Sequence, residues 1–311
     1  MAVYTTVNLT EIQPVLKQLQ LPATSLTPIQ GGMDNSNFFL QTSQGEYVLT
    51  LFESLHPEEV AFFGRLLQQL KGQGLPVASP LCDPKGQWLF QLHQKPLALA
   101  PRLPGAHISK PNPSQCYQVG AALANLHNLE YMPEEICPVP ACSSGWDASF
   151  LAIKCLLQPA QTQLLEQTLQ QYHSQHDTLE SLPRGIIHSD LFRDNTLFDG
   201  DRLTGLLDFY SASNDIYLFD LAVAVNDWCH ITLHDMNRDN YRAIIKGYCQ
   251  LRRVNHVEKA CWPILLKVAA MTYWLFRIEA GAQHHDALRP HKDPGEYHDI
   301  LSFHWQQTLT L

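Results

Sequence analysis

Positive charge is scarce in this chain of 311 residues, which has 21 lysines and arginines against 30 aspartates and glutamates and a net charge of −9. A protein that binds nucleic acid or an anionic membrane through its charge needs a basic patch or stripe. The sequence therefore predicts neither partner. The acidic excess by itself indicates only a solvated surface.

Metal-binding motifs built from cysteine and histidine are also missing. The eight cysteines form no Cys-x-x-Cys pair, and the fifteen histidines contain no His-Glu-x-x-His. Scattered cysteines of this kind are typical of buried free thiols in a reducing compartment. Because the sequence also shows no signal peptide and no uninterrupted apolar run of membrane-spanning length, we expect a soluble cytoplasmic protein.

What the chain does contain is a dense polar motif in residues 186–209. His188-Ser-Asp190 is followed after four residues by Asn195, and Asp208-Phe209 comes later. This spacing is that of a kinase catalytic loop followed by a metal-binding aspartate. Phosphoryl transfer needs a carboxylate that orients the attacking hydroxyl and accepts its proton, and oxygen ligands for a metal on the phosphates. The motif predicts Asp190 for the first role, and Asn195 and Asp208 for the second.

The segment between the two predicted metal ligands indicates how they come together. Two apolar runs, 196–198 and 203–207, flank an Asp-Gly-Asp-Arg turn at 199–202. A hairpin folded about this turn would place Asn195 opposite Asp208, roughly 5 Å apart. An amide oxygen and a carboxylate suit a hard cation such as Mg²⁺. Asp and Asn also occupy ordinary turns, but three such groups at this spacing favour the catalytic interpretation.

Hydrophobic periodicity divides the chain into a strand-rich part, 1–100, and a helix-rich part, 101–311, separated by a Pro- and Gly-containing break at 101–105. In the first part a small polar turn at 31–37 precedes a strand and can present backbone N–H groups to phosphates. More often, such a turn only connects two strands and binds nothing. Three strands are expected within 26–53: the first leads through 29–30 into the turn, and the others are 38–42 and 47–52. Two more are expected at 88–92 and 95–100. The expected helices are 8–20, 57–71, 114–128, 146–157, 161–172, one starting at 220, 241–251 and 262–282.

The motif, together with Asp208-Phe-Tyr and Asp220-Leu-Ala, resembles the aminoglycoside phosphotransferase and choline kinase superfamily over essentially the whole chain. Within it the chain is most similar to the homoserine kinases, through segments such as 34–38, 47–53 and 292–297. The resemblance implies an α+β, bilobal, protein-kinase-like fold. It has a small antiparallel-sheet lobe that binds the nucleotide and a larger, mostly helical lobe that binds the substrate.

The resemblance also implies residue roles, with ATP and Mg²⁺ as the cofactors. Asp190 matches the catalytic base, His188 the residue that braces its loop, and Asp220 an acid that supports the loop. Asn195 and Asp208 match the metal ligands. Residues 31–37 match the nucleotide-positioning loop, and 97–102 resemble the hinge whose backbone would bind adenine. The nucleotide-contacting residues implied in this way are Gly31, Gly32, Asn35, Ser36, Asn37, Thr50, Leu99 and Pro101.

One position departs from the kinase pattern. Kinases of this fold usually carry a lysine on the third strand, paired to a glutamate on the next helix. Thr50 stands there instead, so Glu58 or Glu59 lacks its expected partner. Either the glycine-rich turn and Mg²⁺ suffice, or another cation such as Arg102 or Lys95 takes over the role. A degenerate, inactive kinase is the alternative, but the presence of Asp190, Asn195 and Asp208 argues against it.

The acceptor implied by the resemblance is homoserine, an amino acid with a primary hydroxyl, in threonine biosynthesis. Its pocket needs a cation, an anion and a base near the hydroxyl. Arg277 is predicted to bind the carboxylate and Asp215 to lie near the amine, although an ion pair with an acid of its own lobe is a somewhat more common role for such an arginine. Further candidates are Tyr210, Asn214, Asp227 and Trp228.

Two alternative functions stay open. One is a related kinase that acts on an aminoglycoside, choline, a methylthiosugar or another hydroxylated amine. The other is a nucleotide-binding protein without turnover, for which the missing lysine is the only support.

Overall fold

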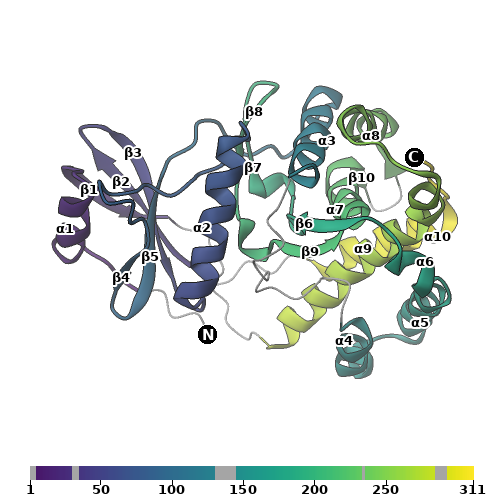
Figure 1. Ribbon diagram of the computed structural model, residues 1–311. Helices are drawn as coiled ribbons and strands as arrows, with labels where there is room; N and C mark the ends of the chain where they lie inside the picture. The colour runs from purple at the N-terminus through teal and green to yellow at the C-terminus, as the bar shows by residue number, and fades with distance from the viewer. Residues whose placement is uncertain (1–4, 30–34, 130–144, 233–234, 284–292) are drawn as a thin grey trace. The chain divides into compact units, whose positions relative to one another are not determined.

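The computed structural model describes residues 5–29, 35–129, 145–232, 235–283 and 293–311. Its contacts divide the chain into two compact units (Figure 1). The first consists of Met1–Ala106, Leu197–Asp199 and Thr204–Tyr210, and the second of His107–Thr196, Gly200–Leu203 and Ser211–Leu311. The predicted division at 100/101 remains a prediction, and these units also assign parts of the later hairpin to the first unit.

The first unit contains an antiparallel sheet of five strands in the order β1-β2-β3-β5-β4. The predicted strands are present, and the first of the three expected within 26–53 is the edge strand β1. Their bounds are β1 Ala23–Pro28, β2 Asn35–Thr42, β3 Gly45–Phe52, β4 Phe90–Leu92 and β5 Lys95–Pro101. The β2–β3 turn is the predicted one at 43–46, and its short length fixes the register in which Asn37 pairs with Thr50.

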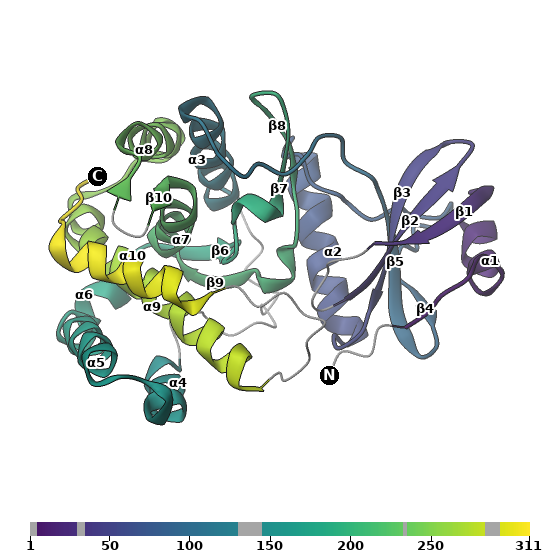
Figure 2. The same ribbon diagram turned by 180° about the vertical axis from the view of Figure 1, so that it is seen from behind.

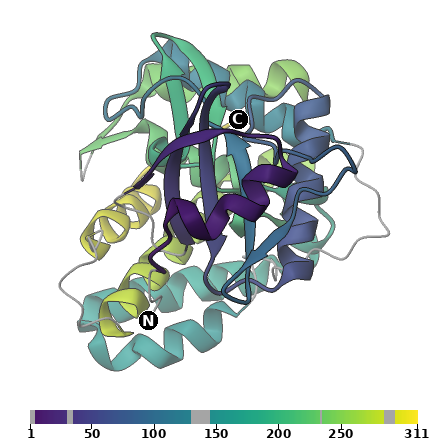
Figure 3. The same ribbon diagram turned by 90° about the vertical axis from the view of Figure 1, so that its left-hand side faces the viewer.

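One helix covers each face of this sheet. Alternation along β3 sends Leu49 and Leu51 to the face covered by α1 (Leu9–Gln18), where they join a buried cluster with Ile12 and Leu16. Figure 3 shows α1 lying across this face. The opposite face carries Phe52 and Ala98 and packs against α2 (Pro57–Gly72) through Val60. The α2 face is therefore the one on which Thr50 lies.

The second unit is mostly helical. Its α-helices are α3 Pro113–His127, α4 Trp146–Ile153, α5 Pro159–Ser174, α6 His176–Glu180, α7 Tyr217–Cys229, α8 Arg238–Leu251, α9 His256–Gln283 and α10 Pro294–Gln306. Figure 2 shows α3 and α8 side by side. Two glycines make this close approach possible. A Cβ on Gly120 would lie 2.0 Å from the Ile244 carbonyl oxygen, and one on Gly247 would lie 2.1 Å from that of Tyr117.

Helix α9 is long and apolar enough to cross a membrane by length and composition alone, although Lys267 and Arg277 interrupt its apolar run. Its mean hydropathy over 18 residues is 1.2, and 72% of that window is buried inside the protein. A helix that is apolar on all sides is also typical of a protein core. Because Leu265, Ala269, Met271 and Leu275 are all buried, the packing accounts for the apolar composition of α9.

Short strand pairs complete the second half of the chain. The predicted hairpin is present as β7 (Thr196–Asp199) and β8 (Arg202–Leu206). Sequence periodicity did not indicate the pair β6 (Arg184–Ile187) and β9 (Ser213–Ile216), because four residues are too few for a clear alternation. The pair β10 (His230–Thr232) and β11 (Asp235–Met236) was missed for the same reason.

Candidate active site

The His188-Ser189-Asp190 segment directly follows β6 and has an unusual backbone. Ser189 is almost completely buried and has φ +67°, in the left-handed region that side-chain-bearing residues rarely adopt. Such a conformation persists only where the surroundings impose it, and it is concentrated at functional sites. The contacts that hold this loop therefore bear directly on where Asp190 points.

Asp220, in the first turn of α7, provides the strongest of these contacts. Its carboxylate accepts hydrogen bonds from the backbone N–H of His188 at 2.8 Å and of Ser189 at 2.9 Å. His127 Nε2 donates a third bond at 3.0 Å. Burial lowers the pKa of His127, although the hydrogen bond to Asp220 opposes the shift. The neutral ring then accepts the Tyr248 hydroxyl at Nδ1, 2.8 Å away.

Three further bonds complete the support of the loop. Tyr273 of α9 donates its hydroxyl to the carbonyl oxygen of Ser189, and Ser189 Oγ lies 3.0 Å from Ser213 Oγ of β9. The ring nitrogen Nδ1 of His188 accepts the backbone N–H of Asp190 at 3.3 Å. His188 therefore contacts the loop as the resemblance implied, and its assignment as a bracing residue remains a proposal.

Asn195 closes the loop from its far end. Its Nδ2 donates to the Asp190 carbonyl oxygen at 2.8 Å and to the Asp190 carboxylate at 2.9 Å. The half-buried carboxylate of Asp190 is thus oriented by a residue five positions later. Neither bond uses Asn195 Oδ1, which as a neutral oxygen donor fits a hard cation.

Asp208 belongs to the first unit, whereas Asn195 belongs to the second, so their predicted proximity stays a prediction. Asp208 is exposed and has φ +59°, which makes it the second non-glycine residue of the motif in the left-handed region, and the following Phe209 is buried. The described residues contain no group of three or more His, Cys, Asp or Glu side chains that could hold a metal ion. Any metal here would therefore depend on mixed oxygen ligands, for which the chemistry of Asn195 and Asp208 is suitable.

The predicted nucleotide-contacting residues occupy the first unit, except that Gly31 and Gly32 lie outside the described residues. Asn37 and Thr50 are cross-strand partners, and the Thr50 hydroxyl donates to Asn37 Oδ1 at 2.8 Å. Asn35 and Ser36 are buried at the start of β2. Leu99 is buried on the α1 face and its carbonyl accepts the N–H of Leu81, whereas Pro101 pairs with Tyr47 at the end of β5.

The two cations considered as replacements for the missing lysine are both engaged in ion pairs. Lys95 bonds to the carboxylate of Glu53, and Arg102 pairs with Glu46 at 3.0 Å. Glu59 bonds to the backbone N–H of His56 and so caps α2. No side chain among these takes the lysine's place in a pair with the α2 glutamates.

Glu53 is a residue that the sequence analysis did not single out. Its side chain is only 3% exposed and also accepts hydrogen bonds from the Ser36 hydroxyl and the Thr5 backbone N–H. Burial by itself would raise its pKa, but the bonds from Lys95, Ser36 and Thr5 outweigh burial and lower the pKa. The only feature of the sequence that could have indicated this role is that Glu53 directly follows an apolar strand.

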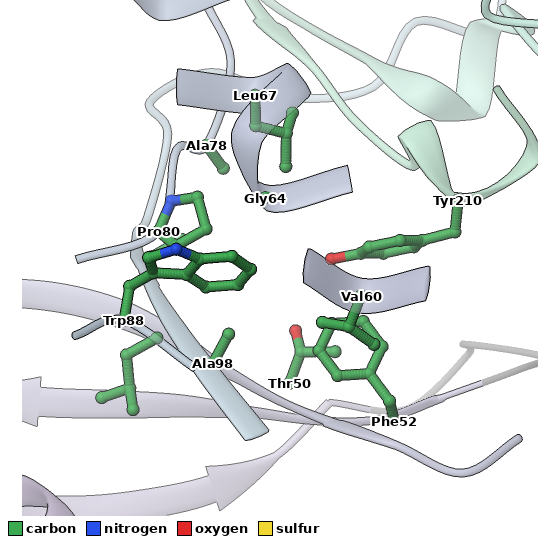
Figure 4. Close-up of a pocket in the computed structure, with 12 residues that line it drawn as sticks. Thr50, Phe52, Val60, Gly64, Leu67, Ala78, Pro80, Trp88, Ala98 and Tyr210 are labelled. Atoms are coloured by element: carbon green, nitrogen blue, oxygen red, sulfur yellow. The ribbon is translucent and has the colours of Figure 1, made fainter. Parts of the chain in front are cut away.

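A pocket in the first unit lies between α2 and the face of the sheet that carries Thr50 (Figure 4). Its walls are mainly apolar, and the hydroxyl of Tyr210 points into it. Tyr210 packs edge-on against Phe52 and Phe63, with ring centroids 5.1 and 5.6 Å away. Burial and the nearby charge of Asp208 raise the pKa of Tyr210. The lining residues are Thr50, Phe52, Val60, Gly64, Leu67, Ala78, Pro80, Trp88, Ala98, Leu99, Ala100 and Tyr210.

Arg277 makes the ion pair that was the alternative to substrate binding. It donates to Glu296 at 2.7 Å and to the carbonyl oxygen of Asp293 at 2.7 Å. Asp215 is fully buried, with Arg184 3.4 Å away and the N–H of Ile216 donating to it. Asn214 is exposed on β9. The contacts of these three residues with a substrate remain predictions.

Asp227 and Trp228 of α7 both contact the segment after Asp190. Trp228 Nε1 donates to the Leu191 carbonyl oxygen at 3.0 Å. Asp227 accepts the backbone N–H of Arg193 at 2.8 Å and its guanidinium at 3.0 and 3.2 Å. This end of α7 therefore fixes the chain between Asp190 and Asn195.

Comparison with known proteins shows the family to which the chain belongs. Residues 25–252 match the model of the phosphotransferase enzyme family. A homoserine kinase from Janthinobacterium sp. (strain Marseille) is 35% identical, over 99% of this chain and 97% of its own length. One from Polaromonas naphthalenivorans (strain CJ2) is 36% identical, over 97% of both chains.

Solved structures share the fold at low sequence identity. An amicoumacin kinase in complex with AMP-PNP, Ca²⁺ and Ami has a TM-score of 0.68 and 16% identity, covering 94% of this chain and 92% of its own. A spectinomycin phosphotransferase in complex with ADP and spectinomycin has a TM-score of 0.66 and 12% identity, covering 97% and 98%. The predicted α+β, protein-kinase-like fold is thereby confirmed. The chain belongs to the phosphotransferase enzyme family, and within it to the group of homoserine kinases that the full-length relatives represent.

Proposed function

We propose that this protein uses ATP to phosphorylate the side-chain hydroxyl of L-homoserine. The observation that carries the proposal is the similarity of about 35% identity over nearly the whole chain to several homoserine kinases. The support of Asp190 by Asn195 and by the tethered loop before it is consistent with a working kinase rather than a degenerate one.

In the proposed reaction Asp190 orients the homoserine hydroxyl and accepts its proton as the oxygen attacks the terminal phosphorus of ATP, and the bond to ADP breaks so that ADP leaves. Asn195 holds the Asp190 carboxylate in place through its 2.9 Å bond. Asn195 Oδ1 and Asp208 are the proposed oxygen ligands of a divalent metal, with Mg²⁺ as our specific proposal. Such an ion, when bound, would neutralise phosphate charge.

No residue in this scheme forms a covalent intermediate. The chain contributes position and charge: the loop sets the direction of Asp190, and the start of β2 with Thr50 is proposed to contact the nucleotide. Arg277 and Asp215 remain the proposed partners of the homoserine carboxylate and amine. Gly31, Gly32, Asn35, Ser36, Asn37, Leu99 and Pro101 remain proposed nucleotide contacts.

A coupled assay of ADP release tests the function. Purified protein with ATP and Mg²⁺ is given homoserine, choline or kanamycin, each as the only acceptor. We expect turnover with homoserine that exceeds the other two by orders of magnitude. Preference for choline or kanamycin would assign a different acceptor, and absence of turnover with every acceptor would support a nucleotide-binding protein.

A further inference from the structure

Tyr297, in α10, has a buried hydroxyl with no hydrogen-bond partner among the described residues. The side chain is 1% exposed. Its ring packs against Tyr273 at a centroid distance of 5.5 Å, and the guanidinium of Arg277 lies 4.4 Å from its centroid. These ring contacts would be equally available to phenylalanine, so they explain the ring but not the oxygen.

An unpartnered buried hydroxyl is costly, and most buried polar side-chain atoms in folded proteins have a partner. Other buried tyrosine hydroxyls in the same unit follow this rule. Tyr248 bonds to His127, and Tyr241 donates to the Thr310 carbonyl oxygen and accepts from Trp262. Tyr297 is thus an exception among these tyrosines, and a bound ligand is one way in which such an exception is resolved.

The surroundings of Tyr297 are those of the proposed catalytic centre. Its ring is 6.4 Å from that of Phe192, two residues after Asp190, and Tyr273 beside it donates to Ser189 in the same loop. The charge of Asp190 also helps to raise the pKa of Tyr297. The Tyr297 ring therefore packs beside the loop that carries the proposed proton acceptor.

Four other charged side chains interact electrostatically with Tyr297, and they form two ion pairs. Asp227 pairs with Arg193, and Glu296 pairs with Arg277. Asp227, Glu296 and Arg277 each act electrostatically on Tyr297, and Tyr297 acts on Arg193. Both acids are already paired with a cation, and none of the four side chains forms a hydrogen bond with the Tyr297 hydroxyl.

We propose that the Tyr297 hydroxyl donates a hydrogen bond to the carboxylate of the amino-acid acceptor and so helps to select it, an inference that rests on the proposed function. Burial raises the pKa of Tyr297, with the nearby acids acting in the same direction, so its hydroxyl stays protonated at neutral pH. An O–H donor needs an acceptor, and an ammonium group has none. The substrate hydroxyl donates to Asp190, and a hydrogen bond donated to its oxygen would weaken it as the nucleophile, which leaves the carboxylate.

The test compares the wild type with Tyr297→Phe, using homoserine and 3-amino-1-propanol, which has the same amine and hydroxyl but no carboxylate. The second compound serves as an acceptor or as a competitor of homoserine. We expect KM for homoserine to rise about tenfold or more in the variant, as for a lost hydrogen bond to a charged group. KM for ATP and the constant for 3-amino-1-propanol should change less than about twofold. The melting temperature should not fall, because the hydroxyl has no partner to lose.

Tyr241→Phe is the matched control, since it removes a partnered hydroxyl from the same unit. It should lower the melting temperature and leave KM for homoserine unchanged. An unchanged KM for homoserine in Tyr297→Phe, an equal change with 3-amino-1-propanol, or a variant that fails to fold would each overturn the inference. If the wild type does not phosphorylate homoserine, the proposed function fails and this inference fails with it. If the wild type phosphorylates homoserine and Tyr297→Phe leaves KM for homoserine unchanged, this inference fails and the proposed function stands.

Discussion

His127 Nε2 lies 3.0 Å from Asp220 Oδ2, and neither side chain has exposed surface. The same carboxylate holds the backbone of His188 and Ser189. One residue of α3 and one of α7 therefore fix the conformation of the loop that carries Asp190. Neither is proposed to touch a substrate.

Replacing Asp220 with asparagine should weaken both activity and stability. The amide offers one oxygen where the carboxylate offered two, so at least one of three buried donors loses its acceptor. We expect a loss of about 3 kcal/mol in the free energy of unfolding, measured by urea titration. Turnover should fall at least tenfold even at temperatures where the variant is fully folded. Full turnover in a folded variant would argue that Asp220 does not position the loop.

Replacing Asp190 with asparagine removes the proposed proton acceptor while keeping the side chain's size. Turnover should fall by about 10²–10⁴, the usual contribution of a general base. Nucleotide affinity, measured by titration calorimetry with ADP and Mg²⁺, should change little. A variant that retains a tenth or more of wild-type turnover would exclude Asp190 from this role.

The buried pair Lys95–Glu53 should matter far more for stability than the exposed pair Arg102–Glu46. Lys95→Met would leave the Glu53 carboxylate buried with one partner fewer, at a cost of roughly 2–4 kcal/mol in urea unfolding. Arg102→Met is the matched control, because this pair also links β3 to the end of β5 but both side chains are nearly half exposed. It should cost less than about 1 kcal/mol. Similar losses of stability in both variants would contradict the expected difference between the buried and the exposed ion pair.

Lowering the pH should remove the contribution of Glu53 to the free energy of unfolding. Its pKa is lowered in the folded protein, so its carboxylate stabilises the fold above the unfolded value of about 4.3. That contribution is lost as the pH falls through the folded pKa. The stability difference between wild type and Glu53→Gln should therefore be largest near pH 7 and shrink below about pH 4. Urea unfolding across this range measures it, and a difference independent of pH would show that charge is not the cause.

Because α3 and α8 lie so close together, adding a single methyl group between them should lower the stability of the protein. Gly120→Ala would bring its Cβ to 2.0 Å from the Ile244 carbonyl oxygen, which forces the helices apart. We expect a loss of about 1–3 kcal/mol by denaturant unfolding. Gly281→Ala in α9, where nothing lies within 4 Å, should instead raise stability by about 0.5–1 kcal/mol. A tolerated Gly120→Ala would mean that the two helices can separate at little cost.

Local patterns allowed most elements and the catalytic motif to be predicted from the sequence. Helix α2 has Pro57 at its first position, acids in its first turn and Lys71 near its end, and the β7–β8 hairpin has an Asp-Gly turn between apolar runs. These signals lie within a few residues of one another. Helix α10 was not predicted as a helix, although Asp293 and Pro294 form a standard start.

Long-range partners could not be predicted in this way. Glu53 and Lys95 are separated by 42 positions, and Tyr273 and Ser189 by 84. Nothing in the neighbouring sequence distinguishes Tyr273 from any other aromatic residue of an apolar helix. Tertiary packing brings such partners together. It also pairs Lys95 with Glu53 and Arg102 with Glu46.

The strained peptide at Ser189 is held by side chains from α3, α7, α9 and β9, which span residues 127 to 273 of the chain. None of these restraints exists until the helices that carry them have assembled. During refolding, enzymatic turnover should therefore return with the last of these segments to dock, later than helical circular dichroism. Catalysis in this protein would then report completed assembly of the second unit, and partly assembled forms would be inactive even where their secondary structure is native.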